Sequence, residues 1–253
     1  MKVLITFALA NEFAPWRKLR HFHRISVDGW DRTYVATVGG NDVRVVLTGA
    51  GRFAVQRSLS RAFDGAPDLC ISAGLAGGLK PAHAPADVLV ARAVGDLASS
   101  RLIQSDGAFV MRAGSAGARV VDKFLVSDRV ISTAEEKAVL AASGDAVDME
   151  SFYVLAASWR HGVRAVAVRA VSDACDSNLP LDFNRVFGER GEVSVFKVAG
   201  QLVRNPMRVP GLLRLANESE RAAVALARFL DAYLEGIEAG PWDELAKAEV
   251  LAL

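Results

Sequence analysis

This chain contains few cysteines, and it lacks the common sequence patterns of metal-binding sites. Its 253 residues include only 2 cysteines, Cys70 and Cys175, which lie in or beside apolar, strand-like segments without CxxC spacing. Such a pair predicts buried thiols in a reducing compartment rather than a disulfide framework. No HExxH pattern is present either, so the sequence predicts no bound metal and no other cofactor.

An excess of one charge and long hydrophobic runs are lacking as well. The net charge is +1, from 30 Lys and Arg against 29 Asp and Glu, which argues against a surface for nucleic acid. No apolar run approaches the roughly 18 residues of a membrane span. The N-terminus begins at once as a strand and lacks the pattern of a secretion signal. We therefore expect a soluble, cytoplasmic protein.

Motifs of several enzyme classes are missing or incomplete. There is no GxxxxGK[ST] phosphate loop and no GxSxG nucleophile elbow, and the histidines have no evident nucleophile partner. The segment Gly49-Ala50-Gly51-Arg52-Phe53-Ala54 fits the GxGxxA pattern of dinucleotide-binding proteins. That pattern needs an acidic residue at the end of the following strand, whereas Asp68 precedes its strand. A nicotinamide enzyme is therefore only a minor alternative.

Apolar segments and helical patterns alternate through most of the chain. Strands are expected at residues 2–9, 24–27, 32–38, 43–47, 68–72, 87–93, 108–112, 123–131, 146–147 and 163–171, and helices near 10–20, 52–63, 133–142, 151–159, 193–203, 210–215 and 217–234. The small-residue segment 73–78 is expected to form a loop. This order predicts an α/β fold with a mixed, mostly parallel central sheet flanked by helices, in a single domain. We assign that domain to residues 1–238 and a C-terminal tail to 239–253.

Three acidic residues follow strands, at the positions where α/β sheets bind ligands. Glu12 comes just after the first strand, Glu150 follows a short apolar run at a helix start, and Asp173 ends a buried strand. Carboxyl ends of parallel strands meet at one edge of a sheet, so we expect these acids in one crevice. Each acid alone also has a structural explanation, because Asp caps helices and Glu in a first turn favours the helix dipole. Because Glu150 and Asp173 stand at adjoining strand ends, a ligand-binding role and a purely structural role both stay open for the pair.

The order of these motifs resembles that of the purine nucleoside phosphorylase and nucleosidase superfamily. The resemblance rests on Glu12, on the glycine-rich segments 49–51 and 73–78, and on Val147-Asp148-Met149-Glu150 and Arg169-Ala170-Val171-Ser172-Asp173. Within it, the chain is similar to the methylthioadenosine/S-adenosylhomocysteine nucleosidases. It is closer still to adenosylhopane nucleosidase-like proteins, through segments 74–79, 146–151, 179–180 and 204–215. The resemblance covers about residues 1–235 and implies a homodimer that acts on a purine nucleoside.

The resemblance implies catalytic roles for three residues. The position matching Asp173 protonates or hydrogen-bonds N7 of the purine, supported by Ser172, and so has to hold a proton near neutral pH. The position matching Glu12 activates the attacking water, and Arg169 orients Glu12 and that water. The predicted catalytic residues are therefore Glu12, Arg169 and Asp173.

Further positions are expected to hold the substrate. The position matching Glu150 accepts hydrogen bonds from the ribose hydroxyls, and Met149 packs under the sugar. Val130 and Ile131 stand where relatives stack on the purine and bond it through the backbone, although an aromatic residue is usual at the first. The predicted substrate-binding residues are Gly74, Leu75, Val130, Ile131, Met149, Glu150 and Ser172.

Two positions bear on whether water or phosphate attacks the sugar. Phosphorylases of this superfamily hold phosphate with an Arg before the glycine-rich segment and a hydroxyl within it, but Ser72 and Leu75 stand there. The missing charge-assisted hydrogen bonds are worth about 1.5–3 kcal/mol each, so water is favoured, while Arg52 keeps phosphate open. The sequence thus predicts an N-ribosyl hydrolase that releases adenine from a 5′-substituted adenosine. A phosphorylase and a non-catalytic nucleoside-binding protein are the alternatives.

Overall fold

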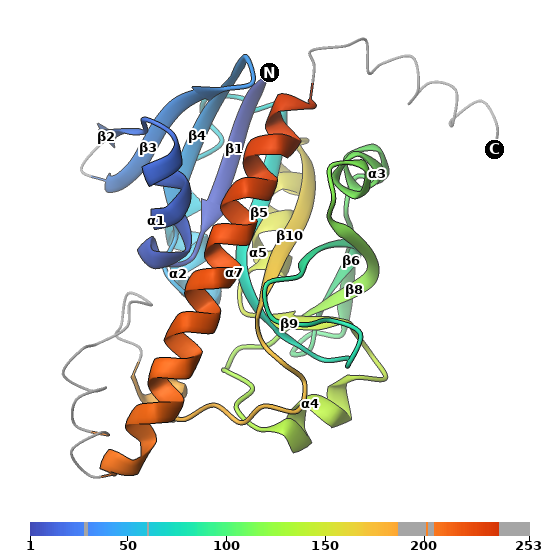
Figure 1. The fold of residues 1–253 in the computed structure, drawn as a ribbon. Helices are drawn as coiled ribbons and strands as arrows, with labels where there is room; N and C mark the ends of the chain where they lie inside the picture. Colours follow the sequence, from blue (N-terminus) through green and yellow to red (C-terminus); the bar gives the residue numbers. More distant parts are fainter. Residues whose placement is uncertain (28–29, 60, 187–200, 202–204, 238–253) are drawn as a thin grey trace, which may run out of the picture.

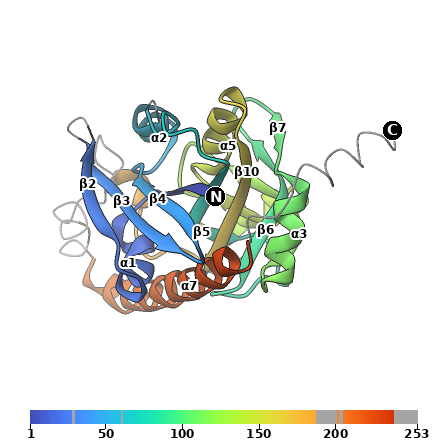
Figure 2. The ribbon, with the colours of Figure 1, turned by 90° about the horizontal axis from the view of Figure 1, so that it is seen from above.

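A curved central sheet with helices on both faces forms the described part of the chain (Figures 1 and 2). The computed structural model describes the whole chain except residues 28–29, 60, 187–200, 202–204 and 238–253. The strands are β1 (Lys2–Phe7), β2 (His23–Val27), β3 (Trp30–Val38), β4 (Asn41–Leu47), β5 (Leu69–Gly78), β6 (Val88–Asp96), β7 (Arg101–Gln104), β8 (Arg119–Val126), β9 (Ala146–Asp148) and β10 (Arg164–Asp173). The helices are α1 (Ala10–Leu19), α2 (Arg52–Leu59), α3 (Gly107–Ser115), α4 (Ala134–Leu140), α5 (Ser151–Arg160) and α7 (Val209–Glu235), with short 3-10 turns η1 (Phe183–Arg185) and η2 (Pro206–Arg208). None of these described helices is both long and apolar enough to cross a membrane.

The strands form one mixed sheet, part of which closes on itself. Parallel pairs join β4 to β1, β1 to β5 and β5 to β10. From β10 the sheet continues through β6 and β8 to β9, which pairs back onto β5 and completes a ring of five strands. The carboxyl ends of β1, β5 and β10 therefore lie at the same edge of the sheet. The mixed α/β class predicted from the sequence is confirmed.

Apolar side chains cover both faces of the central strands. On one face, Ile71 and Val168 belong to a core that includes residues of α1 and α7. On the other face, Cys70 and Ala167 belong to a core that includes residues of α2 and α5. Figure 2 shows α1 and α7 below the sheet and α2 and α5 above it. Strands buried on both faces explain the nearly continuous apolar segments in the sequence.

Three local patterns in the sequence predict their own structure, namely Thr133 and Glu136 a capping box, Gly162 a helix end and Asp28-Gly29 a hairpin turn. The Thr133–Glu136 capping box is formed at the start of α4. Gly162 follows α5 with φ +66°, a conformation that favours glycine. β2 and β3 pair antiparallel as a hairpin, and the turn at 28–29 lies outside the described residues.

The small-residue segment 73–78 is not a loop, contrary to the prediction, but the second half of β5. The segment has a partner strand on each side, because Gly77 and Gly78 pair with β9, and residues 73–77 pair with β10. Paired backbone hydrogen bonds on two sides outweigh the poor strand propensity of glycine. The small side chains serve a close approach instead: a Cβ on Gly74 would lie 3.4 Å from Glu12 Oε1.

The prediction of irregular structure with a strand at 108–112 was also wrong, since this segment is helix α3. Asp106 accepts hydrogen bonds from the amides of Ala108 and Phe109 at 3.1 and 3.2 Å, as an N-cap does. Phe109, Val110 and Ala113 then face the core at helical spacing. This short segment has too few apolar residues for a helical spacing to be distinguished from the alternation of a strand.

A single helix replaces the two helices predicted near the C-terminus. α7 runs without interruption from Val209 to Glu235, so Asn217 lies inside it rather than at a cap. Pro210 is tolerated because it stands in the first turn, where its missing N–H has no partner to lose. The helix predicted at 193–203 and the tail predicted at 239–253 fall outside the described residues.

Candidate active site

Glu12, Glu150 and Asp173 line one cavity of about 260 Å³. They come from the first turn of α1, the residue before α5 and the end of β10. The residues are 7%, 8% and 5% exposed, so each carboxyl group is largely removed from water. The three acids predicted from their places after strands thus meet at one edge of the sheet.

Most of the other predicted site residues surround the same cavity. Leu75, Val130, Ile131, Met149 and Ser172 line it. Gly74 and Arg169 are not among its lining residues and lie behind it, Gly74 against Glu12 and Arg169 in the buried core of the sheet.

Two backbone amides hold Glu12 in place. Its Oε2 accepts a hydrogen bond from Leu9 N at 2.9 Å, and its Oε1 accepts one from Leu75 N at 3.2 Å. Burial raises the pKa of Glu12, and the Leu9 amide and the charge of Arg169 partly oppose that rise. A fixed carboxyl group with a raised pKa is suited to accept a proton near neutral pH.

Glu150 is held by the glycine-rich segment before α2. The amide of Gly51 donates a 2.8 Å hydrogen bond to Glu150 Oε1, and Gly51 has φ +84°, which favours glycine. Burial and the neighbouring charge of Asp148 raise the pKa of Glu150 to about 8, against the opposing charge of Arg169. In this chain the Gly51 amide of the GxGxxA pattern binds the Glu150 carboxyl group. The pattern therefore has a structural role that needs no dinucleotide.

Arg169 contacts different partners from those predicted. Its Nε lies 3.0 Å from Asp148 Oδ2, and its guanidinium donates to Ser72 O at 2.6 Å and to Ser72 Oγ at 3.1 Å. Asp148 and Ser72 occupy the fork of its guanidinium, and the predicted help of Arg169 in orienting Glu12 and the water stays a prediction. The positive charge of Arg169 lowers the pKa of Glu12, against the larger rise that burial causes.

Asp148 is a residue of the site that the sequence analysis missed. Its Oδ1 accepts hydrogen bonds from the amides of Glu150 and Ser151 at 2.8 and 2.9 Å, so it fixes the turn that carries Glu150 just before α5. An Asp that precedes a helix start by a few residues is a recognisable turn signal. Its ion pair with Arg169 joins elements distant in sequence, and no local pattern predicts it.

Lys137 is the second residue that the sequence analysis missed. Asp173 Oδ1 accepts a 2.6 Å hydrogen bond from Ser172 Oγ, and its Oδ2 lies 2.5 Å from Lys137 Nζ. Lys137 is 0% exposed. A buried ammonium group at this distance is a charge partner of the Asp173 carboxyl group, and the sequence analysis did not include it.

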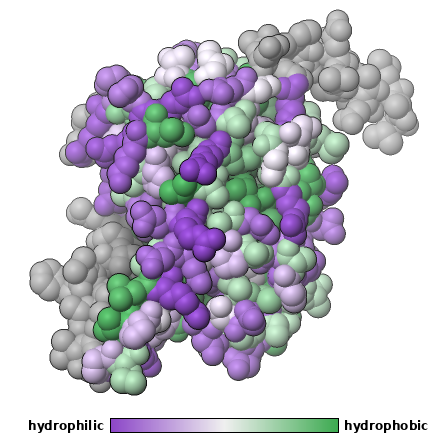
Figure 3. Space-filling model, viewed as in Figure 1, coloured by the Kyte–Doolittle hydropathy of each residue, from purple (hydrophilic) through white to green (hydrophobic). Residues whose placement is uncertain are grey.

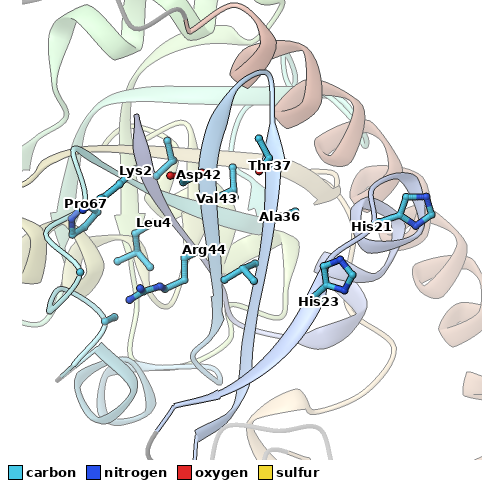
Figure 4. A pocket seen from close by; sticks show the side chains of 14 residues that line it. Lys2, Leu4, His21, His23, Ala36, Thr37, Asp42, Val43, Arg44 and Pro67 are labelled. Atoms are coloured by element: carbon cyan, nitrogen blue, oxygen red, sulfur yellow. The ribbon is translucent and has the colours of Figure 1, made fainter.

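A separate hollow of about 600 Å³ lies away from the three acids (Figure 4). Lys2, Leu4 and Pro67 lie at one end of it, and His21 and His23 lie at the other. None of the predicted site residues lines this hollow. Within the described ranges, moreover, no group of three or more His, Cys, Asp or Glu side chains could hold a metal ion.

Comparison with known proteins gives one family match and many similar folds. The model of the Phosphorylase superfamily matches residues 113–204, whereas no curated protein sequence matches the chain. Futalosine hydrolase of Helicobacter pylori has a TM-score of 0.71 at 16% identity, covering 94% of this chain and 100% of that chain. The 5′-methylthioadenosine/S-adenosylhomocysteine nucleosidase of S. pneumoniae has a TM-score of 0.71 at 17% identity, with coverage of 94% and 100%. The corresponding H. pylori nucleosidase has a TM-score of 0.71 at 18% identity, with coverage of 94% and 99%. The family match and the shared fold confirm the resemblance of this chain to the purine nucleoside phosphorylase and nucleosidase superfamily.

Proposed function

We propose that the protein is a purine nucleosidase, an N-ribosyl hydrolase that releases adenine from a 5′-substituted adenosine. The observation that carries the proposal is the meeting of Glu12, Glu150 and Asp173 in one cavity of about 260 Å³. Breaking the bond between a purine and ribose needs a nucleophile, a grip on the sugar and a group that neutralises the leaving base. Three acidic groups around one small cavity can divide these tasks.

Glu12 is proposed to activate water, and Glu150 is proposed to bind the ribose. Amides from two directions fix Glu12, and burial raises its pKa, so it can take a proton from water during the attack. Glu150 has one oxygen bonded to Gly51 N, and its remaining lone pairs are available to the two ribose hydroxyls. Met149 lines the same cavity and is proposed to pack under the sugar.

The surroundings of three residues support water rather than phosphate as the nucleophile. Ser72, which stands where phosphorylases carry an arginine, accepts hydrogen bonds from Arg169. Arg52 is exposed, lies 5.8 Å from the centre of the Tyr153 ring and is not among the residues that line the cavity. Arg129 does line the cavity, but it is paired with Glu136 at 2.6 Å. A bound phosphate would have to share that guanidinium with Glu136.

A second, larger cavity adjoins the proposed site and supports a substituent on the sugar. It has a volume of about 810 Å³ and shares part of its lining with the first cavity. The shared residues are Ala8, Leu9, Asn11, Leu75, Phe183, Leu215 and Ser219. Small and apolar residues of α1 and α7 form much of its wall, and Figure 3 shows hydrophobic residues gathered over the N-terminal end of α7. Lys18, Arg24, Arg32 and Glu220 also line this cavity. We propose that an apolar 5′ group packs against the apolar part of the wall.

The names of the similar solved structures describe enzymes of the proposed type. Their names describe a futalosine hydrolase and 5′-methylthioadenosine/S-adenosylhomocysteine nucleosidases. We propose the same type of bond cleavage here, on a 5′-substituted adenosine of the methylthioadenosine, S-adenosylhomocysteine or adenosylhopane type.

Base release by the purified protein tests this function. Methylthioadenosine, S-adenosylhomocysteine and adenosine are incubated with and without phosphate, and free adenine and the sugar product are separated by chromatography. A hydrolase gives adenine and free sugar without phosphate, whereas a phosphorylase gives a sugar phosphate. Binding in calorimetry without base release, unchanged in Asp173→Asn, would identify a nucleoside-binding protein instead. Absence of both binding and release would contradict the proposal.

A series of 5′-alkylthio adenosines tests the use of the second cavity. If the alkyl chain enters it, kcat/KM should rise as the chain is lengthened from methyl to octyl. Leu212 lines this cavity, and Leu212→Asp should abolish the gain while leaving methylthioadenosine turnover nearly unchanged. Leu213 is 60% exposed and does not line it, so Leu213→Asp is the matched control. A flat chain-length dependence in the unsubstituted protein would exclude this role.

A further inference from the structure

Lys137 is bound by three oxygen atoms at the end of β10. Its Nζ lies 2.5 Å from Asp173 Oδ2, 2.7 Å from Ala174 O and 3.0 Å from Ser177 O. These partners account for all three protons of the ammonium group. The two carbonyl groups are neutral, so Asp173 is the charge partner among the three.

The first turn of α4 fixes this lysine. Thr133 Oγ1 accepts from Glu136 N at 3.2 Å, and Glu136 Oε2 accepts from Thr133 N at 3.2 Å, so the start of the helix is closed. Lys137 follows directly and is the one buried residue of this helix. It is not among the lining residues of the cavity, whereas Asp173 is. Any effect of Lys137 on a ligand therefore passes through Asp173.

We propose that Lys137 is a positioning residue for the leaving base, which acts by holding Asp173 as an oriented carboxylate and by passing a proton to the base through it. This inference rests on the proposed nucleosidase function. It replaces a lone protonated Asp173 with a Lys137–Asp173 pair as the acid of the site. A buried ion pair is costly to form and weak as a stabiliser, so a chemical role gives a reason for its place at the cavity.

The step balances without another reactant. The bond between C1′ and the base nitrogen breaks, its electron pair stays with the base, and N7 takes a proton from the Asp173 side. Asp173 takes a proton from Lys137, which becomes a neutral amine, while the attacking water bonds to C1′ and gives its proton to Glu12. Return of a proton from Glu12 to Lys137 through solvent restores both groups.

The three oxygen partners suit both charge states of the lysine. Between the two transfers, when the proton of Lys137 is on Asp173 and has not yet reached N7, two N–H groups still donate to Ala174 O and Ser177 O, and the amine lone pair accepts from Asp173. Once N7 has taken the proton, Asp173 is a carboxylate again. Glu12, Asp148, Glu150 and Arg129 are the other charged groups that line the cavity.

The inference can be tested with two substrates. The leaving group of one has to be protonated, and the leaving group of the other does not. Lys137→Met keeps the length of the side chain and removes the proton. It should lower kcat/KM for methylthioadenosine about 100-fold or more, the usual size of a general-acid contribution. p-Nitrophenyl riboside departs without protonation, so its kcat/KM should change by less than about threefold in the same variant. Equal losses on the two substrates, or no loss on methylthioadenosine, would overturn the inference.

A matched control and a measurement without turnover separate the possible failures. Lys80 Nζ lies 2.7 Å from Asp145 Oδ1 outside the cavity, so Lys80→Met should leave both substrates unaffected. In the wild-type protein, the carbon-13 shift of the Asp173 carboxyl should be that of an ionised group near neutral pH. A neutral Asp173 there would overturn the inference even if Lys137→Met does not fold. Failure of the wild-type protein to release adenine would instead reject the proposed function, and this inference with it.

Discussion

Arg169 Nε lies 3.0 Å from Asp148 Oδ2, and both side chains are almost fully buried. Arg169 belongs to β10, which ends in Asp173, and Asp148 accepts hydrogen bonds from the amides of Glu150 and Ser151 at the turn before α5. The ion pair therefore links the strand that carries one acid of the site to the turn that carries another. Its loss would disturb their separation as well as the stability of the fold.

Asp148→Asn should be strongly destabilising. It leaves a buried guanidinium without its charge partner, which costs about 3–5 kcal/mol when one member of a buried pair is removed. Urea unfolding measures the change in free energy. Asp96 is a matched control, because it is buried but accepts from Ala98 N, Ser99 Oγ and Tyr153 OH rather than from a cation. Asp96→Asn should cost about 1–3 kcal/mol, and equal losses in the two variants would contradict the role given to the pair.

Glu12→Gln should abolish most of the activity. The amide cannot take a proton from water, and removal of a general base costs about 10²–10⁴-fold in kcat. Glu135 is exposed in the first turn of α4, so Glu135→Gln serves as the control and should keep full activity. Rates of adenine release from methylthioadenosine give the comparison. Full activity of Glu12→Gln in phosphate buffer would show that Glu12 does not activate the nucleophile.

The stability of the unliganded protein should fall as pH rises through the range in which Glu150 ionises. Its pKa is about 8 in the fold against 4.5 as the reference, so between these values the folded state binds more protons than the unfolded state. The free energy of unfolding therefore decreases with pH over that window. Glu150→Gln should make the slope shallower without removing it, because the pKa of Glu12 is also raised. Urea unfolding at a series of pH values measures the slope, and an identical slope in the variant would contradict the assignment.

Gly74→Ala should reduce catalysis more than stability. The added Cβ would lie 3.4 Å from Glu12 Oε1 and 3.5 Å from Oε2, at the short end of van der Waals contact, so it takes up the space beside the carboxyl group. A misplaced catalytic group can cost up to about 100-fold, and a contact of this length allows only a slight shift, so we expect a loss of roughly 3–10-fold in kcat/KM. Gly107, at the start of α3, has nothing within 4 Å of the added Cβ, and Gly107→Ala should be neutral. A neutral Gly74→Ala would show that Glu12 needs no fixed position.

The sequence predicted the central features of the site because they follow from position along strands. Glu12 follows β1 and Asp173 ends β10, and the parallel order of β1, β5 and β10 brings those ends together. Glu150 follows β9, which reaches the same cavity by pairing antiparallel with the end of β5. The cap before α4 and the glycine after α5 were predictable for the same reason, since each depends on a few neighbouring residues.

What the sequence could not predict depends on contacts between distant segments. Lys137 reaches Asp173 across 36 positions, and nothing local distinguishes it from a surface lysine of an amphipathic helix. The segment 73–78 has the composition of a loop, and its pairing on both sides makes it a strand. The homodimer and the cytoplasmic location stay predictions.

Hydrolysis of methylthioadenosine in phosphate-free, oxygen-18-labelled water gives the sharpest test of the shared role of the three acids. The wild-type protein should release adenine together with one labelled oxygen at C1 of the sugar, and Asp173→Asn should do so at least about 100 times more slowly. Release of adenine at the same rate by both proteins, or binding of 5′-substituted adenosines with no release at all, would contradict a nucleosidase built on Glu12, Glu150 and Asp173.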